Sequence, residues 1–203
     1  LALMASLALR AGRERGTLSP EDEKELVHAL SEVPRLMSQV LHAVQPQIEK
    51  LSRELSHFHH VLYLGRGTSY PLALEGALKL KEITYIHAEG YAAGEMKHGP
   101  IALIDDQVPV IVIAPHDRIF EKTVSNMQEV AARGGRIILI TDEKGAKNAT
   151  LDTLETVVLP DVPEFVAPII YALPIQMLAY HTAVIMGTDV DQPRNLAKSV
   201  TVE

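Results

Sequence analysis

Three ionisable side chains share one face of a segment with helical spacing, and a histidine follows on a turn. Glu75, Lys79 and Glu82 stand at positions i, i+4 and i+7, so a helix places them on the same side. His98 precedes a Gly-Pro pair that breaks regular structure. Carboxylate, amine and imidazole groups carry protons in enzymes, so this stretch is the first candidate for a catalytic site.

The same spacing also has an ordinary structural explanation. A Glu75–Lys79 pair at i, i+4 stabilises an exposed helix by about 0.2–0.5 kcal/mol. Such ion pairs are more common on helix faces than catalytic groups are. Spacing alone therefore leaves a solvated ion pair and a catalytic face as open alternatives.

The local pattern predicts the elements that would position these groups. The helix has an apolar stripe opposite its charged face, formed by Ala73, Leu74, Ala77, Leu78 and Leu80. Ile83, Tyr85 and Ile86 place β-formers close together, which predicts a short strand over residues 83–89, directly after the helix.

A second candidate site is the glycine-rich turn between a predicted strand, Val61–Leu64, and this helix. Such a turn is a common place for a phosphate, because free N–H groups and the helix dipole point there. The candidate residues are Gly65, Gly67, Thr68 and Ser69. The turn matches neither the P-loop nor the dinucleotide pattern, so a tight turn that binds nothing is an equally good explanation.

A histidine cluster precedes the first strand and consists of His57, His59 and His60. No carboxylate or fourth ligand stands at a spacing that would complete a metal site. We expect a polar connection between helix and strand, and no metal.

Composition limits the classes of function. The net charge of −7 has no long run of one sign, which argues against nucleic acid and anionic membranes as partners. The absence of cysteine excludes disulfides, a cysteine nucleophile and zinc–thiolate sites, and is compatible with a cytoplasmic protein. Apolar runs are interrupted too soon for a membrane span.

Strand-length apolar runs alternate with helix-length segments over the rest of the chain. Further strands are predicted at residues 108–114, 136–141 and 156–159, with a helix at 119–133 between the first two. The first of these is fully apolar, so we place it in the centre of a parallel sheet. Repeated βαβ units predict an α/β fold with helices on both faces of the sheet.

Helices are predicted before and after these strands. Ser19 followed by proline is typical of a helix start, and we expect this helix to end near Glu32, with Pro34 kinking or restarting the chain. Pro168 and Pro174 should bend a long apolar helix that is buried core or an interface. The other predicted helices cover residues 1–15, 46–57 and 163–186.

Three stretches of the chain together resemble the C-terminal part of the glutamine–fructose-6-phosphate aminotransferase family. They are residues 73–83, residues 92–103 and the tail from Thr188 to Glu203. The tail sequence Pro-Arg-Asn-Leu-Ala-Lys-Ser-Val-Thr-Val-Glu is the most specific of them. The similarity extends over essentially all 203 residues.

The resemblance implies a sugar-isomerase (SIS) type of α/β fold. This is a three-layer αβα sandwich with a parallel five-stranded sheet, preceded by helices. Residues 1–45 would be a helical segment left from a preceding SIS domain, and residues 46–203 the second SIS domain with a catalytic tail. We expect the sequence to begin part-way through a longer protein, inside a helix.

The resemblance also implies a reaction and a role for individual residues. Members of the family convert fructose 6-phosphate to glucosamine 6-phosphate with ammonia from glutamine, and need no cofactor. Lys198 would condense with the C2 ketone, and Glu82, beside Lys79, would carry a proton between C1 and C2. His98 would help to open the sugar ring in the site of a neighbouring subunit, which implies a homodimer. Glu82 and Ala197 would contact the substrate.

Two functions stay open on this basis. The chain is either the isomerase part of such an enzyme, or a non-catalytic SIS module that binds phosphosugars or serves as a dimerisation unit. The glutaminase domain and the phosphate-holding loop of the first SIS domain lie outside these residues. We therefore expect the 203 residues alone to make no product.

Overall fold

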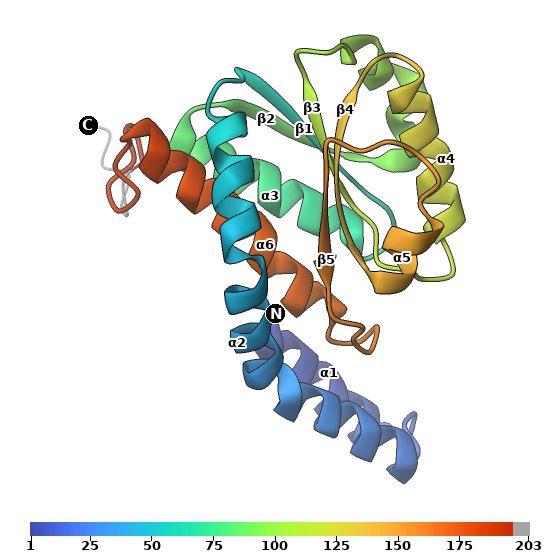
Figure 1. Ribbon diagram of the computed structural model, residues 1–203. Coiled ribbons are helices and arrows are strands. Elements are labelled where there is room, and N and C mark those ends of the chain that lie inside the picture. Colours follow the sequence, from blue (N-terminus) through green and yellow to red (C-terminus); the bar gives the residue numbers. More distant parts are fainter. Residues whose placement is uncertain (197–203) are drawn as a thin grey trace, which may run out of the picture.

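A five-stranded sheet between two layers of helices forms the body of the molecule (Figure 1). The computed structural model describes residues 1–196. All strand pairs are parallel, in the order β2-β1-β3-β4-β5. The strands are β1 His60–Gly65, β2 His87–Ala92, β3 Pro109–Ile113, β4 Arg136–Asp142 and β5 Glu155–Leu159. The predicted α/β fold class and the central position of the most apolar strand are confirmed.

Helices cover both faces of this sheet. One layer contains α2, α3 and α6, and the other contains α4, α5 and the 3₁₀ helix η1 (Figure 1). The helices are α1 Ala2–Glu14, α2 Pro20–Leu55, α3 Ser69–Thr84, α4 Phe120–Ala131, α5 Glu143–Asn148 and α6 Ala167–Met186, with 3₁₀ helices η1 Ala93–His98 and η2 Pro100–Leu103.

Each strand divides its side chains between the two layers because successive residues point to opposite faces. In β3, Ile111 and Ile113 belong to the core cluster under α2, α3 and α6, whereas Val110 and Val112 belong to the cluster under α4. All four side chains are fully buried. The continuous apolar run in the sequence thus reflects a strand that is covered on both faces.

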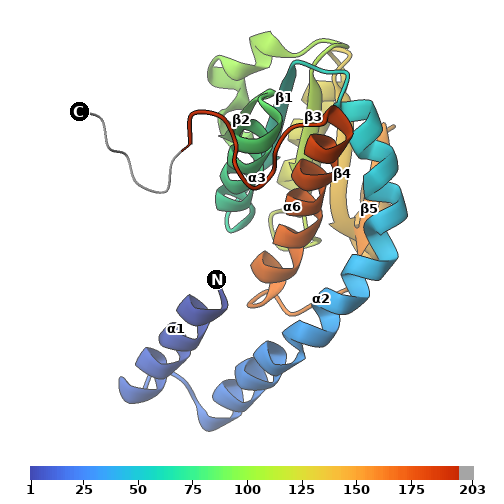
Figure 2. The ribbon, with the colours of Figure 1, turned by 90° about the vertical axis from the view of Figure 1, so that its left-hand side faces the viewer.

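Helix α2 is a single 36-residue helix, so the predicted division into one helix ending near Glu32 and another beginning at Pro46 is wrong. Pro34 and Pro46 both lie inside it, and Figure 2 shows that the helix curves along its length. An interior proline costs about 3 kcal/mol. Burial of one large aliphatic side chain contributes about 1.5–3 kcal/mol, and α2 buries a long stripe of them, which outweighs both prolines. The buried aliphatic side chains are Val33, Leu36, Val40, Val44, Ile48, Leu51 and Leu55.

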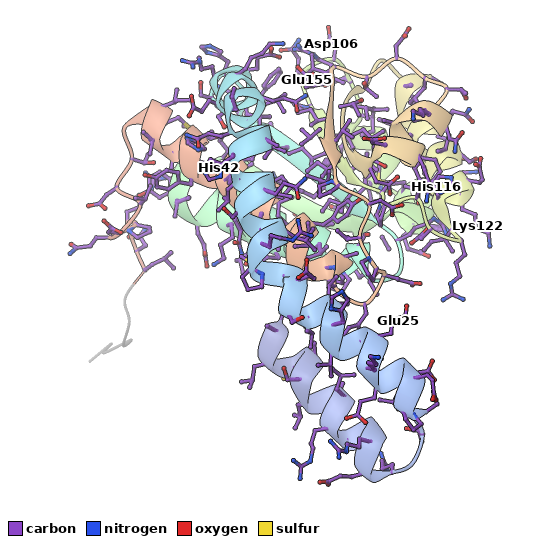
Figure 3. All side chains as sticks on the ribbon, turned by 60° about the horizontal axis from the view of Figure 1, so that its bottom comes forward. Glu25, His42, Asp106, His116, Lys122 and Glu155 are labelled. Carbon is purple, nitrogen blue, oxygen red and sulfur yellow. The ribbon has the colours of Figure 1, made fainter. Side chains whose placement is uncertain are left out.

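The N-terminal part of α2 pairs with α1 and projects away from the sheet (Figure 3). Ser19 caps α2 as predicted, with its hydroxyl accepting a hydrogen bond from the Asp22 N–H at 3.1 Å. The predicted division of the chain between residues 45 and 46 falls within α2. Val44 and Ile48, on either side of that division, are buried in the same core cluster.

Helix α6 lies against both α2 and α3. Pro168 occupies its first turn, where a proline requires no bend, and Pro174 lies inside the helix. By length and composition alone α6 could cross a membrane, but 56% of its apolar window is buried within the fold. Its packing between two other helices is that of a core helix.

Candidate active site

The predicted charged face of α3 is present and contains a close ion pair. Lys79 Nζ donates a hydrogen bond to Glu82 Oε2 at 2.7 Å, and the two side chains are 37% and 27% exposed. This hydrogen bond is the main reason that the pKa of Lys79 lies above its usual value, and the charges of Glu82 and Glu75 act in the same direction. Lys79 is therefore held as a cation beside the carboxylate.

The opposite face of α3 packs on the sheet and on α6, but it is not the predicted stripe. Ala73, Ala77 and Leu80 are buried as expected, whereas Leu74 and Leu78 are 44% and 42% exposed. The buried stripe lies about one residue earlier and includes Leu72 and Gly76 instead. This rotation brings the Lys79–Glu82 pair to the rim of the packed surface and keeps it accessible.

The strand predicted over residues 83–89 begins later than expected, because α3 continues to Thr84 and β2 covers His87–Ala92. The Thr84 hydroxyl donates to the Leu80 carbonyl at 2.6 Å and accepts from the Ile86 N–H at 3.2 Å, which closes the last turn. Tyr85 then adopts a left-handed conformation, with φ 65°, and ends the helix. Local β-propensity was overridden by the burial of Leu80 and Thr84 against the sheet.

The segment after α6 returns to this end of α3 (Figure 2). Thr188 Oγ1 donates to the Ile83 carbonyl at 2.6 Å, and the Arg194 N–H donates to the Tyr85 hydroxyl at 3.0 Å. The Arg194 guanidinium also lies 4.0 Å from the centre of the Tyr85 ring. The beginning of the tail is thus attached next to Glu82. Ala197 and Lys198, predicted on the tail, lie outside the described residues.

His98 lies apart from Lys79, Glu82 and the beginning of the tail. It is the last residue of η1 and is exposed, and η1 packs in the layer that contains α4, on the other side of the sheet from α3. The hydrogen bonds and ion pairs of residues 1–196 do not connect His98 with Lys79 or Glu82. The structure therefore brings Lys79, Glu82 and the tail together, but not His98.

Two contacts that the sequence analysis missed hold η1 in place. Arg66 Nε donates to Asn126 Oδ1 of α4 at 3.1 Å, and a Cβ at Gly94 would come within 2.8 Å of the Arg66 guanidinium. Lys97 Nζ lies 2.7 Å from Glu129 Oε1 of α4, and its hydrogen bond holds the pKa of Glu129 below the usual range. Because these partners are far apart in the sequence, spacing gives no signal for them.

The glycine-rich turn after β1 is tightly closed on itself. A Cβ at Gly65 would lie 2.2 Å from the Ser69 carbonyl oxygen, so only glycine fits there. The Ser69 and Tyr70 N–H groups donate to the Arg66 and Gly67 carbonyls at 2.9 and 3.2 Å. Two donors that a phosphate would need are already used within the turn.

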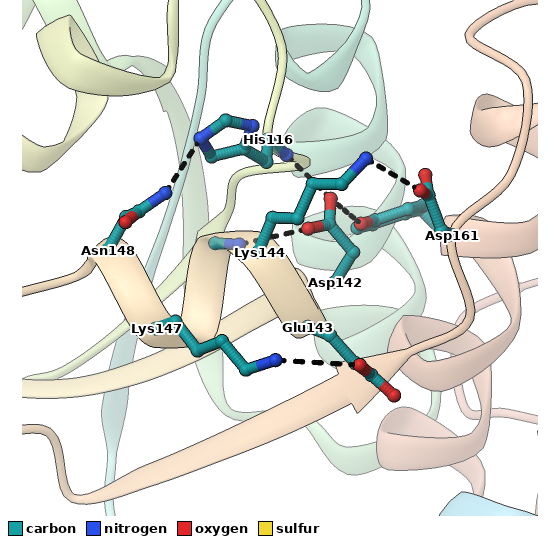
Figure 4. A network of polar contacts seen from close by, with 9 residues as sticks. His116, Asp142, Glu143, Lys144, Lys147, Asn148 and Asp161 are labelled. Carbon is teal, nitrogen blue, oxygen red and sulfur yellow. Dashed lines mark hydrogen bonds and ion pairs between the residues drawn. The ribbon is translucent and has the colours of Figure 1, made fainter.

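Thr68 of this turn lines a cavity of about 210 Å³ at the carboxyl ends of the strands. Most of the charged residues in its lining are acidic: Asp117, Asp142, Asp161 and Glu164 outnumber Arg118. Asp142 is buried and accepts hydrogen bonds from the His116 and Gly145 N–H groups at 2.7 and 2.9 Å (Figure 4). Charge and hydrogen bonding here favour the tight-turn explanation of residues 65–69 over a phosphate site.

The histidines near β1 do not form one cluster. His60 begins β1 and lies beside His87 of β2, with 3.3 Å between their Nδ1 atoms, while His57 and His59 stay in the connection after α2. Within residues 1–196 no group of three or more His, Asp or Glu side chains is arranged to hold a metal ion.

The order of the strands and the helices on both faces match a known domain type. The SIS domain model matches residues 54–186. The chain belongs to the SIS domain family.

Relatives of this SIS domain have a more specific name. The chain is 74% identical over all 203 residues to glutamine–fructose-6-phosphate aminotransferase (isomerizing) of Rhizobium meliloti, and 75% identical to that of Agrobacterium fabrum. It is similar, with a TM-score of 0.88 and 40% identity, to the C-terminal domain of glucosamine-fructose-6-phosphate aminotransferase from Francisella tularensis, covering 92% of this chain and 52% of that one. The SIS chain spans about a third of the length of the two curated relatives.

Proposed function

We propose that this SIS domain is the isomerase part of a glutamine–fructose-6-phosphate aminotransferase. The 74% identity to such an enzyme over the whole chain carries the proposal. The reaction converts fructose 6-phosphate and glutamine to glucosamine 6-phosphate and glutamate. It includes an isomerisation from ketose to aldose and the incorporation of ammonia, and belongs to amino-sugar biosynthesis in the cytoplasm.

Glu82 is proposed to move the proton from C1 to C2 of the sugar. A group with this role needs a carboxylate that substrate can reach and that has hydrogen-bonding capacity left. Glu82 is 27% exposed and is paired with Lys79 through one of its oxygens. The raised pKa of Lys79 keeps that lysine charged, so Lys79 places a positive charge beside Glu82 and is poorly suited to be the nucleophile itself.

Lys198 is proposed to form the imine. Its amine attacks the C2 carbonyl carbon and water leaves; ammonia later displaces the lysine and leaves its nitrogen on the sugar. The attachment of Arg194 to Tyr85 supports this role. Arg194 precedes Lys198 by four residues in the tail, and Tyr85 follows Glu82 by three residues at the end of α3, so the contact brings the two segments together. Ala197, next to Lys198, is proposed to contact the substrate.

His98 is proposed to assist ring opening in the site of a second subunit, since an imidazole titrates near neutral pH. Its exposed position on η1, in a different layer from Glu82, supports a role in a partner's site. A homodimer is therefore part of the proposal. Neither nucleic acid nor a membrane is proposed as a partner, in agreement with the net charge of −7.

The alternative is a non-catalytic SIS module that binds phosphosugars or mediates dimerisation. The acidic cavity and the closed turn at residues 65–69 offer no cradle for a phosphate, so within this alternative they favour dimerisation over phosphosugar binding at the carboxyl ends of the strands. The two functions differ in one observable: only the catalytic one forms a covalent adduct between the sugar and a tail lysine.

Borohydride reduction of the full-length protein with fructose 6-phosphate tests the proposal. Borohydride converts an imine into a stable secondary amine, and mass spectrometry then locates it. We expect the adduct on Lys198 and its loss in Lys198→Arg, because a guanidinium stays protonated and forms no imine. The matched control is Lys24→Arg on the exposed side of α2, which should be trapped like the parent. Equal trapping of Lys198→Arg would contradict the proposed role of Lys198.

A further inference from the structure

Tyr85 has a backbone conformation that an aromatic residue rarely adopts. Its φ of 65° and ψ of 8° lie in the left-handed region, and Asn195 is the other non-glycine residue with positive φ in the described chain. Glycine and asparagine are the usual residues at such a helix end, because a side chain with Cβ crowds the following carbonyl. A tyrosine that is kept in this conformation points to a use for its side chain.

The Tyr85 side chain makes two separate contacts with one residue of the tail. Its hydroxyl accepts a hydrogen bond from the Arg194 N–H at 3.0 Å, and its ring carries the Arg194 guanidinium 4.0 Å from the ring centre. The first contact fixes the backbone of the tail, and the second is a cation–π interaction with its side chain. Tyr85 is half-buried, so the ring itself is held on the body of the domain.

The tail is also attached at its beginning, at Thr188, six residues before Arg194. The Thr188 hydroxyl donates to the Ile83 carbonyl, one of the backbone groups that the end of α3 leaves without a helical partner. Between these attachments, Asp189 Oδ1 accepts from the Asp191 and Gln192 N–H groups at 2.9 Å and so folds the segment into a turn. Residues 188–194 are thus pinned at both ends to residues 83–85.

The helix end that receives the tail is the one that holds Glu82. Glu82 precedes Ile83 directly and lies three residues before Tyr85, within the final turn of α3. A displacement of Tyr85 therefore changes the position of the tail relative to Glu82.

We propose that Tyr85 is a positioning residue that holds the C-terminal tail against the end of α3, in register with Glu82. The left-handed conformation turns its ring toward Arg194, and the helix end serves as the fixed point for the segment that continues to Lys198. The catalytic consequence rests on the proposed function, whereas the attachment of the tail does not.

Hydrogen–deuterium exchange of the tail in the full-length protein tests the attachment. Tyr85→Gly removes the ring but suits the backbone conformation, so the domain should melt at the same or a higher temperature. We expect exchange in residues 187–196 to become roughly tenfold faster, since a hydrogen bond and a cation–π contact are lost together. Tyr85→Phe keeps the ring and should show a smaller increase. Tyr70→Phe, at an exposed tyrosine early in α3, is the matched control and should leave the tail unchanged.

Arg194→Ala tests whether both residues act through one contact. In the double variant with Tyr85→Gly, exchange of the tail should be no faster than in Tyr85→Gly alone, because the ring that Arg194 contacts is already absent. Independent, multiplying effects would overturn the proposal, as would unchanged tail exchange in a folded Tyr85→Gly protein.

A kinetic measurement separates positioning from a general structural role. In Tyr85→Gly we expect kcat to fall about tenfold or more with little change in the KM for fructose 6-phosphate, because the tail delivers a reacting group. A rise of KM alone would contradict this role. If Lys198→Arg is trapped like the parent, the proposed function fails, yet the exchange experiment still decides whether Tyr85 holds the tail.

Discussion

Asp142 and Glu82 are carboxylates at different places in the SIS domain, and they differ in burial and in hydrogen-bond partners. Asp142 is the last residue of β4, is 6% exposed and accepts two backbone hydrogen bonds, with the Tyr171 hydroxyl 3.5 Å away. Burial, followed by the nearby charge of Asp142, raises the pKa of that tyrosine. Glu82 lies at the accessible end of α3 and is paired with Lys79.

The difference shows how hydrogen bonding separates a structural carboxylate from a candidate base. Asp142 caps α5 and ties the loop after β3 to it, so its lone pairs are committed to the backbone (Figure 4). Among the hydrogen bonds of residues 1–196, Glu82 accepts one from Lys79 through Oε2, so its carboxylate retains further acceptor capacity. Asp142 lines a cavity of about 210 Å³, but the chemistry is proposed at Glu82, which is more exposed than Asp142.

The largest effect is expected from Glu82→Gln in the full-length protein. Exchange of the C1 proton of fructose 6-phosphate should fall about 10²–10⁴-fold, because the amide cannot act as a base. Unfolding free energy should change by less than about 1 kcal/mol, as for other exposed ion pairs. NMR of the sugar in D₂O measures the first quantity and urea titration the second. Glu121→Gln on α4 is the control, and normal exchange in Glu82→Gln would show that the charged face of α3 is only a solvated stripe.

Asp142→Ala should reduce the stability of the fold much more than Glu82→Gln does. Loss of the cap of α5 and of the hydrogen bond to the His116 N–H is expected to lower the unfolding free energy by roughly 2–4 kcal/mol. The matched control is Asp161→Ala, whose pair with Lys144 is exposed and should contribute less than about 1 kcal/mol. Urea denaturation followed by circular dichroism measures both. If Asp142→Ala lowered the unfolding free energy no more than Asp161→Ala does, Asp142 would not be a structural carboxylate in the sense that distinguishes it from Glu82.

Glu129 is a third carboxylate, and its replacement should have a small effect on the unfolding free energy that depends on pH. Its pKa is lowered in the folded protein by the hydrogen bond from Lys97, so its stabilisation is present above the ordinary pKa of about 4.5 and is lost as the pH falls through the lowered value. The difference in unfolding free energy between the parent and Glu129→Gln should be below about 1 kcal/mol near pH 6 and shrink toward pH 3. Glu143→Gln, at an exposed position on α5, is the control. A difference that stays constant with pH would mean that the Lys97–Glu129 pair does not stabilise η1.

Local patterns in the sequence were sufficient for the class of fold. Apolar runs of strand length gave β1, β3, β4 and β5, because buried parallel strands need apolar side chains on both faces. Ser19 marked the beginning of α2, since a capping hydroxyl acts within one turn. The face shared by Glu75, Lys79 and Glu82 also follows from helical geometry alone.

Tertiary packing decided the continuity and the ends of helices. The sequence signals at Pro34 and Pro46 indicate breaks, but the buried stripe of α2 outweighs them. The β-formers at residues 83–86 indicate that a strand begins there, but burial of Leu80 and Thr84 extends α3 to the point where Tyr85 turns the chain, and β2 begins at His87.

The sequence by itself determined the identities of the candidate groups and the resemblance that gives them roles. Only the tertiary structure decided which of them meet: the tail returns to Tyr85 beside Glu82, and η1 places His98 in another layer. It also showed that Arg66 and Lys97 hold η1 through partners on α4. The physical reason is range, because propensity and capping act over a few residues, whereas these contacts join segments 32 to 109 residues apart and exist only once the sheet has brought them together.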